Sequence, residues 1–138
     1  MAENTMKVEI ISPDRIFYEG DATLVEMVVS EGEIGILPGH IPMTNILKPG
    51  ILKLYNGNTV KYAALHEGFV EILQDKVTIL AETAEWPDEI DVDRAREAEE
   101  RAKKRITGRP GEFDIARAEL ALRRALIRIE LVERYKKE

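Results

Sequence analysis

The chain changes its residue usage abruptly at Trp86-Pro87-Asp88. Residues 1–88 carry 6 basic and 14 acidic side chains, a net charge of −8, whereas residues 89–138 carry 14 basic and 12 acidic side chains, a net charge of +2. Seven of the nine glycines lie in the first part, and ten of the eleven arginines lie in the second. Proline disfavours helix in the residue before it and is tolerated at a helix start. We therefore predict two domains, residues 1–87 and residues 88–138.

The first part is typical of a β-domain, because short segments rich in β-branched and aromatic residues alternate with turn residues. The predicted strands are Val8–Ile11, Thr23–Ser30, Ile51–Tyr55, Val60–Leu65, Phe69–Leu73 and Val77–Ala81, and Asn56-Gly57-Asn58 is typical of a hairpin turn. No helical segment interrupts them, which favours an antiparallel sandwich over a parallel sheet. Apolar residues such as Val28 and Leu80 stand between the alternating core positions, which indicates an outer face that is partly covered.

The second part predicts two helices, Asp91–Ile106 and Phe113–Lys136, since strong helix formers dominate both. Thr107-Gly108-Arg109-Pro110-Gly111 supplies a short turn, so the helices are expected to be antiparallel neighbours. The second helix has more apolar surface than a two-helix hairpin buries, and it is expected to rest on the sandwich, on another protein, or on each in turn. The predicted fold class is α+β, an N-terminal antiparallel β-sandwich followed by a C-terminal antiparallel two-helix hairpin.

Several function classes are disfavoured by what the chain contains. The absence of cysteine removes disulfides, a thiolate nucleophile and cysteine-ligated zinc, and fits a reducing compartment. The glycine-rich signatures of nucleotide hydrolysis, dinucleotide binding and acyl transfer are missing. His40 and His66 lie far apart in the sequence, and no third residue is nominated as a zinc ligand. The longest uncharged run, Gly35–Leu47, is shorter than the roughly 20 apolar residues of a membrane span. We expect no catalytic residue, no metal site and no direct insertion into a membrane.

The arginines of the predicted hairpin fall on one stripe of each helix, at spacings of seven and four. The two sets are Arg94, Arg101, Arg105 and Arg117, Arg124, Arg128. One interpretation is a solvated surface in which arginines pair with acidic neighbours, as Arg101 with Glu97 and Arg134 with Glu130. The other is a phosphate clamp, because the planar guanidinium donates two parallel charge-assisted bonds to a phosphate. Arg105, Arg124 and Arg128 have no acidic residue three or four positions away, so the clamp stays open beside the simpler interpretation.

Asp91 also has two interpretations. It is a good N-cap for the first helix, which is the favoured interpretation, and its carboxylate is a candidate acceptor for a ligand amino group.

Three segments together resemble the epsilon subunit family of bacterial rotary ATP synthases, over essentially the whole chain. The first is the loop Ser30-Glu31-Gly32-Glu33-Ile34-Gly35-Ile36-Leu37-Pro38-Gly39-His40-Ile41-Pro42. The second is Gly68-Phe69-Val70-Glu71-Ile72 followed by Val77-Thr78-Ile79-Leu80-Ala81. The third is Ile90-Asp91-Val92-Asp93-Arg94-Ala95, which is similar to the motif that opens the hairpin in ATP-binding members, with Arg117–Ala125 similar to their second helix.

This resemblance implies a non-catalytic rotor subunit. In the family the sandwich docks on the gamma subunit and the c-ring, at the cytoplasmic face of the cell membrane, as a peripheral part of a proton-transporting ATP synthase. The hairpin is mobile, and in its extended form it enters the alpha-beta assembly and blocks ATP hydrolysis. Basic residues of the hairpin are then expected to meet acidic surfaces of the catalytic subunits, namely Arg123, Arg124, Arg128 and Lys136.

The resemblance also assigns residues. The ATP-binding positions are Glu85, Ile90, Asp91, Arg94, Ala95, Arg101, Arg124 and Arg128, with the four arginines on the phosphates and Glu85, Ile90 and Asp91 around adenine. ATP is thus a regulatory ligand that holds the hairpin folded, and no cofactor is required. Glu33 and His40 are the candidates for the c-ring contact, with a turn-forming, solvent-facing role as the alternative.

Two other functions remain. A free-standing ATP-sensing module would use the same arginines without a rotor partner. A helical nucleic-acid binder is disfavoured, because the interleaved glutamates and the net charge of −6 repel a phosphate backbone.

Overall fold

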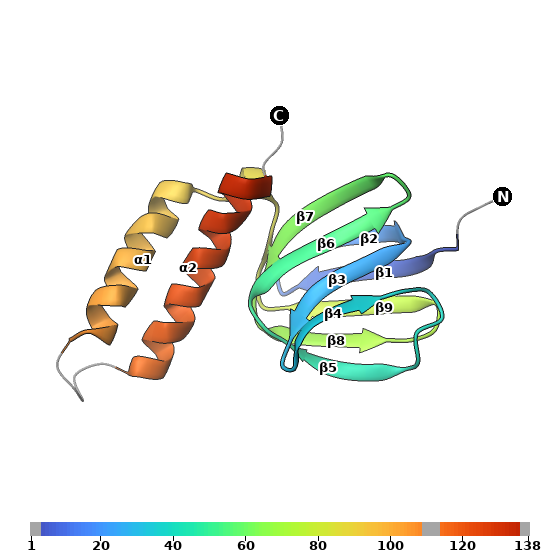
Figure 1. The fold of residues 1–138 in the computed structure, drawn as a ribbon, viewed down its shortest axis with the longest axis horizontal. Helices are drawn as coiled ribbons and strands as arrows, with labels where there is room; N and C mark the ends of the chain where they lie inside the picture. The colour runs from blue at the N-terminus through green and yellow to red at the C-terminus, as the bar shows by residue number, and fades with distance from the viewer. Residues whose placement is uncertain (1–3, 109–113, 136–138) are drawn as a thin grey trace. The chain divides into compact units, whose positions relative to one another are not determined.

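The computed structural model describes residues 4–108 and 114–135. The chain divides into two compact units, the first ending at Glu85 and the second beginning at Trp86. Figure 1 shows the first unit as strands and the second as helices, which confirms the predicted fold class.

The first unit is built from ten strands and no helix within its described residues. They are β1 (Met6–Ser12), β2 (Arg15–Ala22), β3 (Leu24–Val29), β4 (Gly32–Ile36), β5 (Met43–Leu47), β6 (Gly50–Asn56), β7 (Thr59–Leu65), β8 (Gly68–Ile72), β9 (Lys76–Ala81) and β10 (Ala84–Glu85).

The strands follow one another in the order β10-β7-β6-β3-β5-β8-β9-β1-β2, and β4 pairs with β3 outside this path. The sheet folds back on itself, because β2 also contacts β6 (Figure 1). All pairs described are antiparallel except β1 with β9, which run parallel. A parallel pair needs a long connection, and six other strands lie between β1 and β9 in the chain besides β2. The sequence predicted an antiparallel sandwich. The parallel pair is possible because β1 and β9 lie far apart in the chain.

Side chains alternate between the core and the outer face along the strands, as the pleat requires. The predicted alternation in β3 is confirmed, since Val25, Met27 and Val29 are buried. The fully buried large side chains of this unit include Met6, Val8, Ile10, Ile36, Leu47, Leu52, Leu65, Ile72 and Ile79.

Four strands lie outside the six predicted segments: β2, β4, β5 and β10. β2 contains Glu19-Gly20-Asp21 and β4 contains two glycines, residue types that favour turns over strands. β5 and β10 are short. Pairing with a neighbouring strand overrides these local preferences, because the hydrogen bonds of the ladder satisfy backbone groups whatever the intrinsic preference of the residues.

Gly68 is required where β8 meets β9. A Cβ at this position would lie 1.8 Å from the carbonyl oxygen of Leu80, so no other residue fits without moving the backbone. Gly57, in the predicted hairpin turn between β6 and β7, has a φ of 63°, a conformation that glycine adopts without strain. The predicted turn is confirmed.

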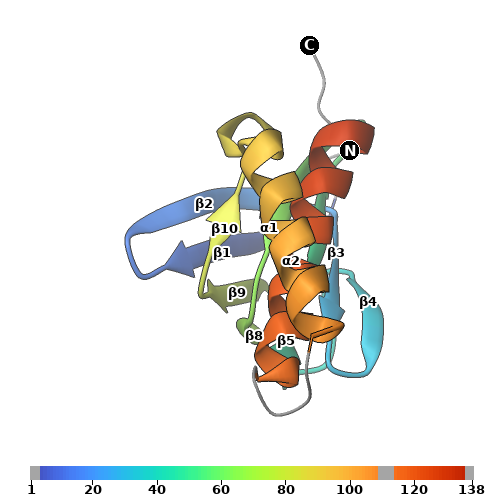
Figure 2. The same cartoon turned by 90° about the vertical axis from the view of Figure 1, so that its left-hand side faces the viewer.

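The second unit consists of a short 3-10 helix, η1 (Pro87–Glu89), and two α-helices, α1 (Val92–Ile106) and α2 (Ile115–Tyr135). The helices lie side by side and antiparallel (Figures 1 and 2), as predicted. The outermost predicted residues of the second helix, Phe113 and Lys136, lie outside the described residues, as does most of the predicted turn. Part of the apolar surface of α2 is exposed, including Leu126 at 44%.

Candidate functional site

The first turn of α1 is organised by Asp91. Its carboxylate accepts hydrogen bonds from the backbone N–H groups of Asp93 at 3.1 Å and Arg94 at 3.2 Å, and its carbonyl oxygen accepts from the N–H of Ala95 at 3.1 Å. Ile90 stands just before it and donates its N–H to the carbonyl of Pro87 at 3.3 Å. The favoured interpretation of Asp91 as an N-cap is confirmed. Four of the residues assigned to ATP thus lie together at the start of α1, namely Ile90, Asp91, Arg94 and Ala95.

The remaining assigned residues of this unit are arginines on both helices. Arg96 of α1 forms an ion pair with Glu133 of α2. This contact shows which residues of the two antiparallel helices lie beside each other. With the same rise per residue in each helix, Arg101 lies at about the level of Arg128. Arg124 lies one turn, about 6 Å, further along, and Arg94 lies about 10 Å away in the opposite direction.

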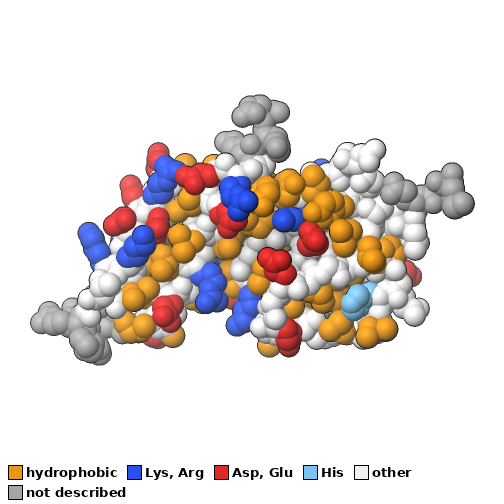
Figure 3. Space-filling model, viewed as in Figure 1, with side chains coloured by type: hydrophobic (Ala, Val, Ile, Leu, Met, Phe, Trp, Pro, Cys, Tyr) orange, Lys and Arg blue, Asp and Glu red, His pale blue; other side chains and the backbone are white. Residues whose placement is uncertain are grey.

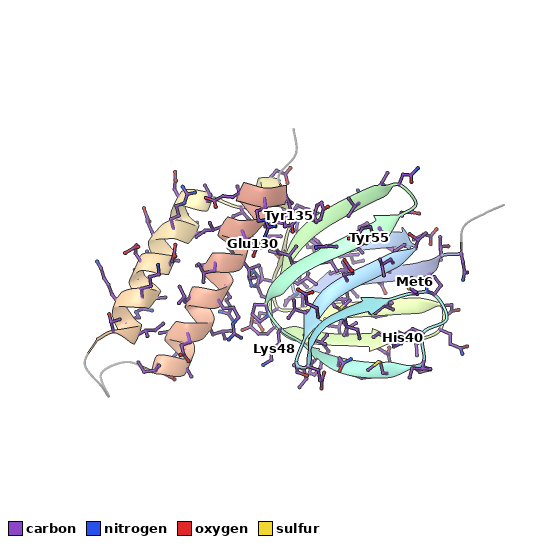
Figure 4. The ribbon with its side chains drawn as sticks, viewed as in Figure 1. Met6, His40, Lys48, Tyr55, Glu130 and Tyr135 are labelled. Carbon is purple, nitrogen blue, oxygen red and sulfur yellow. The ribbon has the colours of Figure 1, made fainter. Side chains whose placement is uncertain are left out.

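These arginines differ in their surroundings. Arg94 and Arg101 are exposed and make no ion pair with any described residue. Arg124 and Arg128 are half-buried and interact with other residues. The expected pair of Arg134 with Glu130 is present at 3.1 Å (Figure 4 labels Glu130), whereas the expected pair of Arg101 with Glu97 is absent from the described part of the chain. Of the four, only Arg101 and Arg128 lie at one level of the hairpin, and guanidinium groups placed in this way on neighbouring helices are suited to bind an anion.

Glu85 belongs to the first unit, at the end of β10. β10 pairs with β7 so that Glu85 lies opposite Ala64. Its carboxylate oxygen Oε1 lies 3.4 Å from Nε2 of His66, a residue whose side chain is only 1% exposed. The sequence carried no signal for this contact, because the two residues are 19 positions apart and neither belongs to a local pattern.

The two c-ring candidates lie on β4 and in the loop that follows it. Glu33 is exposed on β4, opposite Val28 of β3. His40 donates its backbone N–H to Leu37 at 3.2 Å, and its Nδ1 lies 2.7 Å from the carbonyl oxygen of Ile41. No hydrogen bond or ion pair joins Glu33 to His40 in the described residues.

This loop exposes apolar side chains on both sides of His40, Leu37 at 59% and Ile41 at 71%. His40 is labelled in Figure 4. In the space-filling view of Figure 3, hydrophobic side chains lie beside the pale blue histidine. Gly39 has a φ of 87° and donates its N–H to Gln74 at 2.7 Å, so the loop is tied to the segment between β8 and β9.

A second exposed apolar feature runs across five strands of the sheet. Ile46 of β5 lies opposite Phe69 of β8, Phe69 opposite Leu80 of β9, Leu80 beside Ile11 of β1, and Ile11 opposite Ile16 of β2. We call these five residues the apolar row. Four of them are large and exposed: Ile46 at 53%, Phe69 at 57%, Leu80 at 47% and Ile16 at 61%. Exposed apolar side chains that neighbour one another across strands are typical of surfaces that bind a partner. The sequence signalled only Leu80, as an apolar residue out of phase with the core.

Within the described residues, no cluster of three or more histidine, aspartate or glutamate side chains is arranged to hold a metal ion. Neither α1 nor α2 has the length and apolar character of a membrane-spanning helix in the parts that are described.

Two family models match consecutive parts of the chain. The model of the ATP synthase delta/epsilon chain β-sandwich domain covers residues 5–87, and the model of the ATP synthase delta/epsilon chain long α-helix domain covers residues 88–133. A solved structure of the Euglena gracilis mitochondrial ATP synthase, containing OSCP, F1 and the c-ring, includes a chain with the same fold. It matches with a TM-score of 0.82 at 24% identity, over 96% of this chain and 84% of that one.

Curated relatives agree with these models. The chain is 49% identical to the ATP synthase epsilon chain of Halalkalibacterium halodurans, over 94% of this chain and 98% of the relative. It is 43% identical to that of Bacillus pumilus, over 92% and 96%, and 40% identical to that of Caldanaerobacter subterraneus, over 96% and 97%. The chain therefore belongs to the family of ATP synthase epsilon chains.

Proposed function

We propose that this chain is a non-catalytic central-stalk subunit of an F-type ATP synthase, which couples the catalytic head to the c-ring and restrains ATP hydrolysis. The observation that carries the proposal is the apolar row. Leaving four large apolar side chains in water is unfavourable, and covering them by a partner stabilises the assembly by about 25 cal/mol for each Å² of apolar surface removed from water.

The occupant of the apolar row in this proposal is the gamma subunit. The c-ring contact is assigned to the separate loop around His40 and to Glu33, where exposed Leu37 and Ile41 offer apolar contact beside polar groups. The subunit would then be peripheral, at the cytoplasmic face of the cell membrane. A free-standing ATP sensor, the alternative function, has no use for two exposed apolar surfaces on its sandwich.

The hairpin is the regulatory part of the proposal. ATP bound to Arg94, Arg101, Arg124 and Arg128 holds the folded form, because its phosphates contact both helices at once. When ATP is lost, the hairpin extends into the alpha-beta assembly and blocks hydrolysis, and α2 exchanges one apolar partner for another. The partial exposure of Leu126 and Ile115 supports an α2 surface that serves in a second contact.

Co-purification with the gamma subunit tests the docking proposal. The tagged full chain and the gamma subunit of the same synthase would be expressed together, and the amount of gamma retained would be compared between wild type and the double variant Phe69→Ser, Leu80→Ser. We expect the double variant to lose gamma, since both side chains are exposed and their replacement leaves the core intact.

Thr59→Ala is the matched control, at an exposed position of β7 outside the apolar row. Equal retention of gamma by all three chains would reject the apolar row as the docking surface.

A further inference from the structure

A second row of side chains crosses the same five strands beside the apolar row. In the order in which they lie opposite or beside one another, its members are Thr44 of β5, Glu71 of β8, Thr78 of β9, Glu9 of β1 and Glu19 of β2. We call these five residues the acidic row. On each of β5, β8, β9 and β1 its member is two residues from that of the apolar row, and on β2, where the register shifts, it is three residues away. Side chains two residues apart on a strand share a face and lie about 7 Å apart, so one segment of a partner can touch both rows.

Two carboxylates of the acidic row have no partner in the described part of the chain. Glu19 and Glu71 are exposed, and their side chains make no hydrogen bond or ion pair with any described residue. The lysines that follow on this face are already paired, Lys76 with Glu9 at 3.5 Å and Lys7 with the aspartate opposite it at 3.7 Å. The two free carboxylates are therefore available to a cation from outside the chain.

This arrangement costs the free chain stability. Glu9 and Glu19 lie directly opposite each other on β1 and β2, and like charges in this position destabilise a sheet. Beside them, the apolar row leaves large apolar side chains in water. A partner that brings basic groups to one row and apolar groups to the other reduces both costs at once.

The other side of the apolar row carries negative charge as well. Ile11, Phe69 and Leu80 line a hollow in the surface, and Glu67 and Glu82 line it with them. Glu82 is exposed, and its side chain has no hydrogen-bond or ion-pair partner among the described residues. The apolar row is thus flanked by carboxylates on both sides.

We propose that the acidic row selects the partner that covers the apolar row, and that the contact surface of this partner carries lysine or arginine side chains beside apolar ones. The proposal rests on the proposed docking of the gamma subunit and names the chemistry of the gamma surface that docks. Charges at the edge of an interface chiefly speed association and reject wrong partners, whereas closely packed apolar contacts determine how long a complex lasts. The carboxylates therefore act in recognition, and Phe69 and Leu80 hold the complex together.

The rate at which the full chain associates with the purified gamma subunit tests this, measured by biolayer interferometry at about 0.05 M and about 0.5 M salt. The association rate constant of wild type is expected to fall as the salt concentration rises. The double variant Glu19→Gln, Glu71→Gln is expected to associate about three- to tenfold more slowly at low salt, to lose most of the salt dependence and to dissociate at nearly the wild-type rate.

Two further variants serve as controls. Glu19→Asp, Glu71→Asp keeps both charges and is expected to retain most of the association rate. Glu31→Gln removes one exposed carboxylate in the turn between β3 and β4, outside both rows, and is expected to associate like wild type, whereas Glu71→Gln alone is expected to be slower. Thermal unfolding separates recognition from damage to the fold, because the double glutamine variant removes the repulsion between Glu9 and Glu19 and is expected to melt no lower than wild type.

An unchanged association rate and salt dependence in the double glutamine variant would overturn the proposal, and so would an equal loss in Glu31→Gln. A melting temperature below that of wild type would contradict the cost of the acidic row and with it the reason for assigning the row to a partner. Failure of wild type to bind gamma at either salt concentration would instead reject the proposed docking itself.

Discussion

The carboxylate of Asp91 accepts the backbone N–H of Arg94 at 3.2 Å, and this bond joins the start of α1 to one of the four arginines assigned to ATP. The segment that resembles the ATP motif of the family is thus also the segment that begins the helix. Fixing the backbone at Arg94 fixes the direction of its Cα–Cβ bond. The structural role of Asp91 as the cap and its proposed role in ATP binding therefore fall on one side chain, and substitution is needed to separate them.

Asp91→Ala removes the cap, and we expect it to lower the stability of α1 by about 1 kcal/mol. Asp91→Asn is the matched control, because its amide oxygen accepts the same backbone bonds without the charge. Thermal unfolding followed by circular dichroism at 222 nm measures the difference. If the two variants lose helix equally, the hydrogen bonds at the cap are not what stabilises this end of α1.

Arg128→Ala is expected to weaken ATP binding by about tenfold or more, since in the proposed site it removes a charge-assisted hydrogen bond to phosphate. The fluorescence of Trp86, the single tryptophan of the chain, and calorimetry give two independent readouts of the titration. Arg134→Ala serves for comparison, because Arg134 lies on the same helix but is paired with Glu130. Identical ATP affinities for wild type and Arg128→Ala would exclude this arginine from the site.

Gly68→Ala is expected to destabilise the sandwich by roughly 1–3 kcal/mol or more, because the added Cβ would lie 1.8 Å from the carbonyl oxygen of Leu80 and the backbone of β8 would have to move. Gly35→Ala in β4 tests the specificity of this effect. Its Cβ would meet only the side chain of Leu24 at 3.7 Å and that of Glu26 at 3.9 Å, which are ordinary contacts. Urea unfolding of both variants measures the difference, and equal midpoints would contradict the close approach at Gly68.

Stability is expected to fall at high pH through Tyr18. Burial raises the pKa of its phenol above the ordinary value of 10.0, and the negative charge of Asp21 raises it further. As the pH rises above about 10, the unfolded chain therefore loses this proton before the folded chain does. The free energy of unfolding then decreases with rising pH. Below about pH 10, Tyr18 contributes no such change.

Chemical unfolding at about pH 8 and about pH 11 checks this sign. Tyr18→Phe, which cannot ionise, is expected to lose less stability between the two values than wild type. An equal loss in both chains would show that other groups cause the alkaline decrease.

The helical unit and six of the strands could be predicted from local sequence. Asp91 caps α1 through hydrogen bonds from residues two and three positions later in the chain. Such contacts are local, so a short stretch of sequence is enough to predict them. The same holds for the turn at Gly57, whose positive φ is a property of the residue type. The change of composition near Trp86 likewise separated strands from helices without any knowledge of distant contacts.

The strand pairings decided the rest. Phe69 and Val70 are adjacent apolar residues of β8, yet Phe69 is 57% exposed and Val70 is fully buried, because the pleat turns neighbouring side chains to opposite faces. Register then aligns Phe69 with Ile46 and Leu80 into the apolar row, and the pairing of β10 with β7 brings Glu85 to His66. By itself the sequence determined which residues form helices and most strands, since those preferences are local. Only the tertiary structure decided which face each side chain takes and which distant residues meet, because both depend on a register that joins segments far apart in the chain.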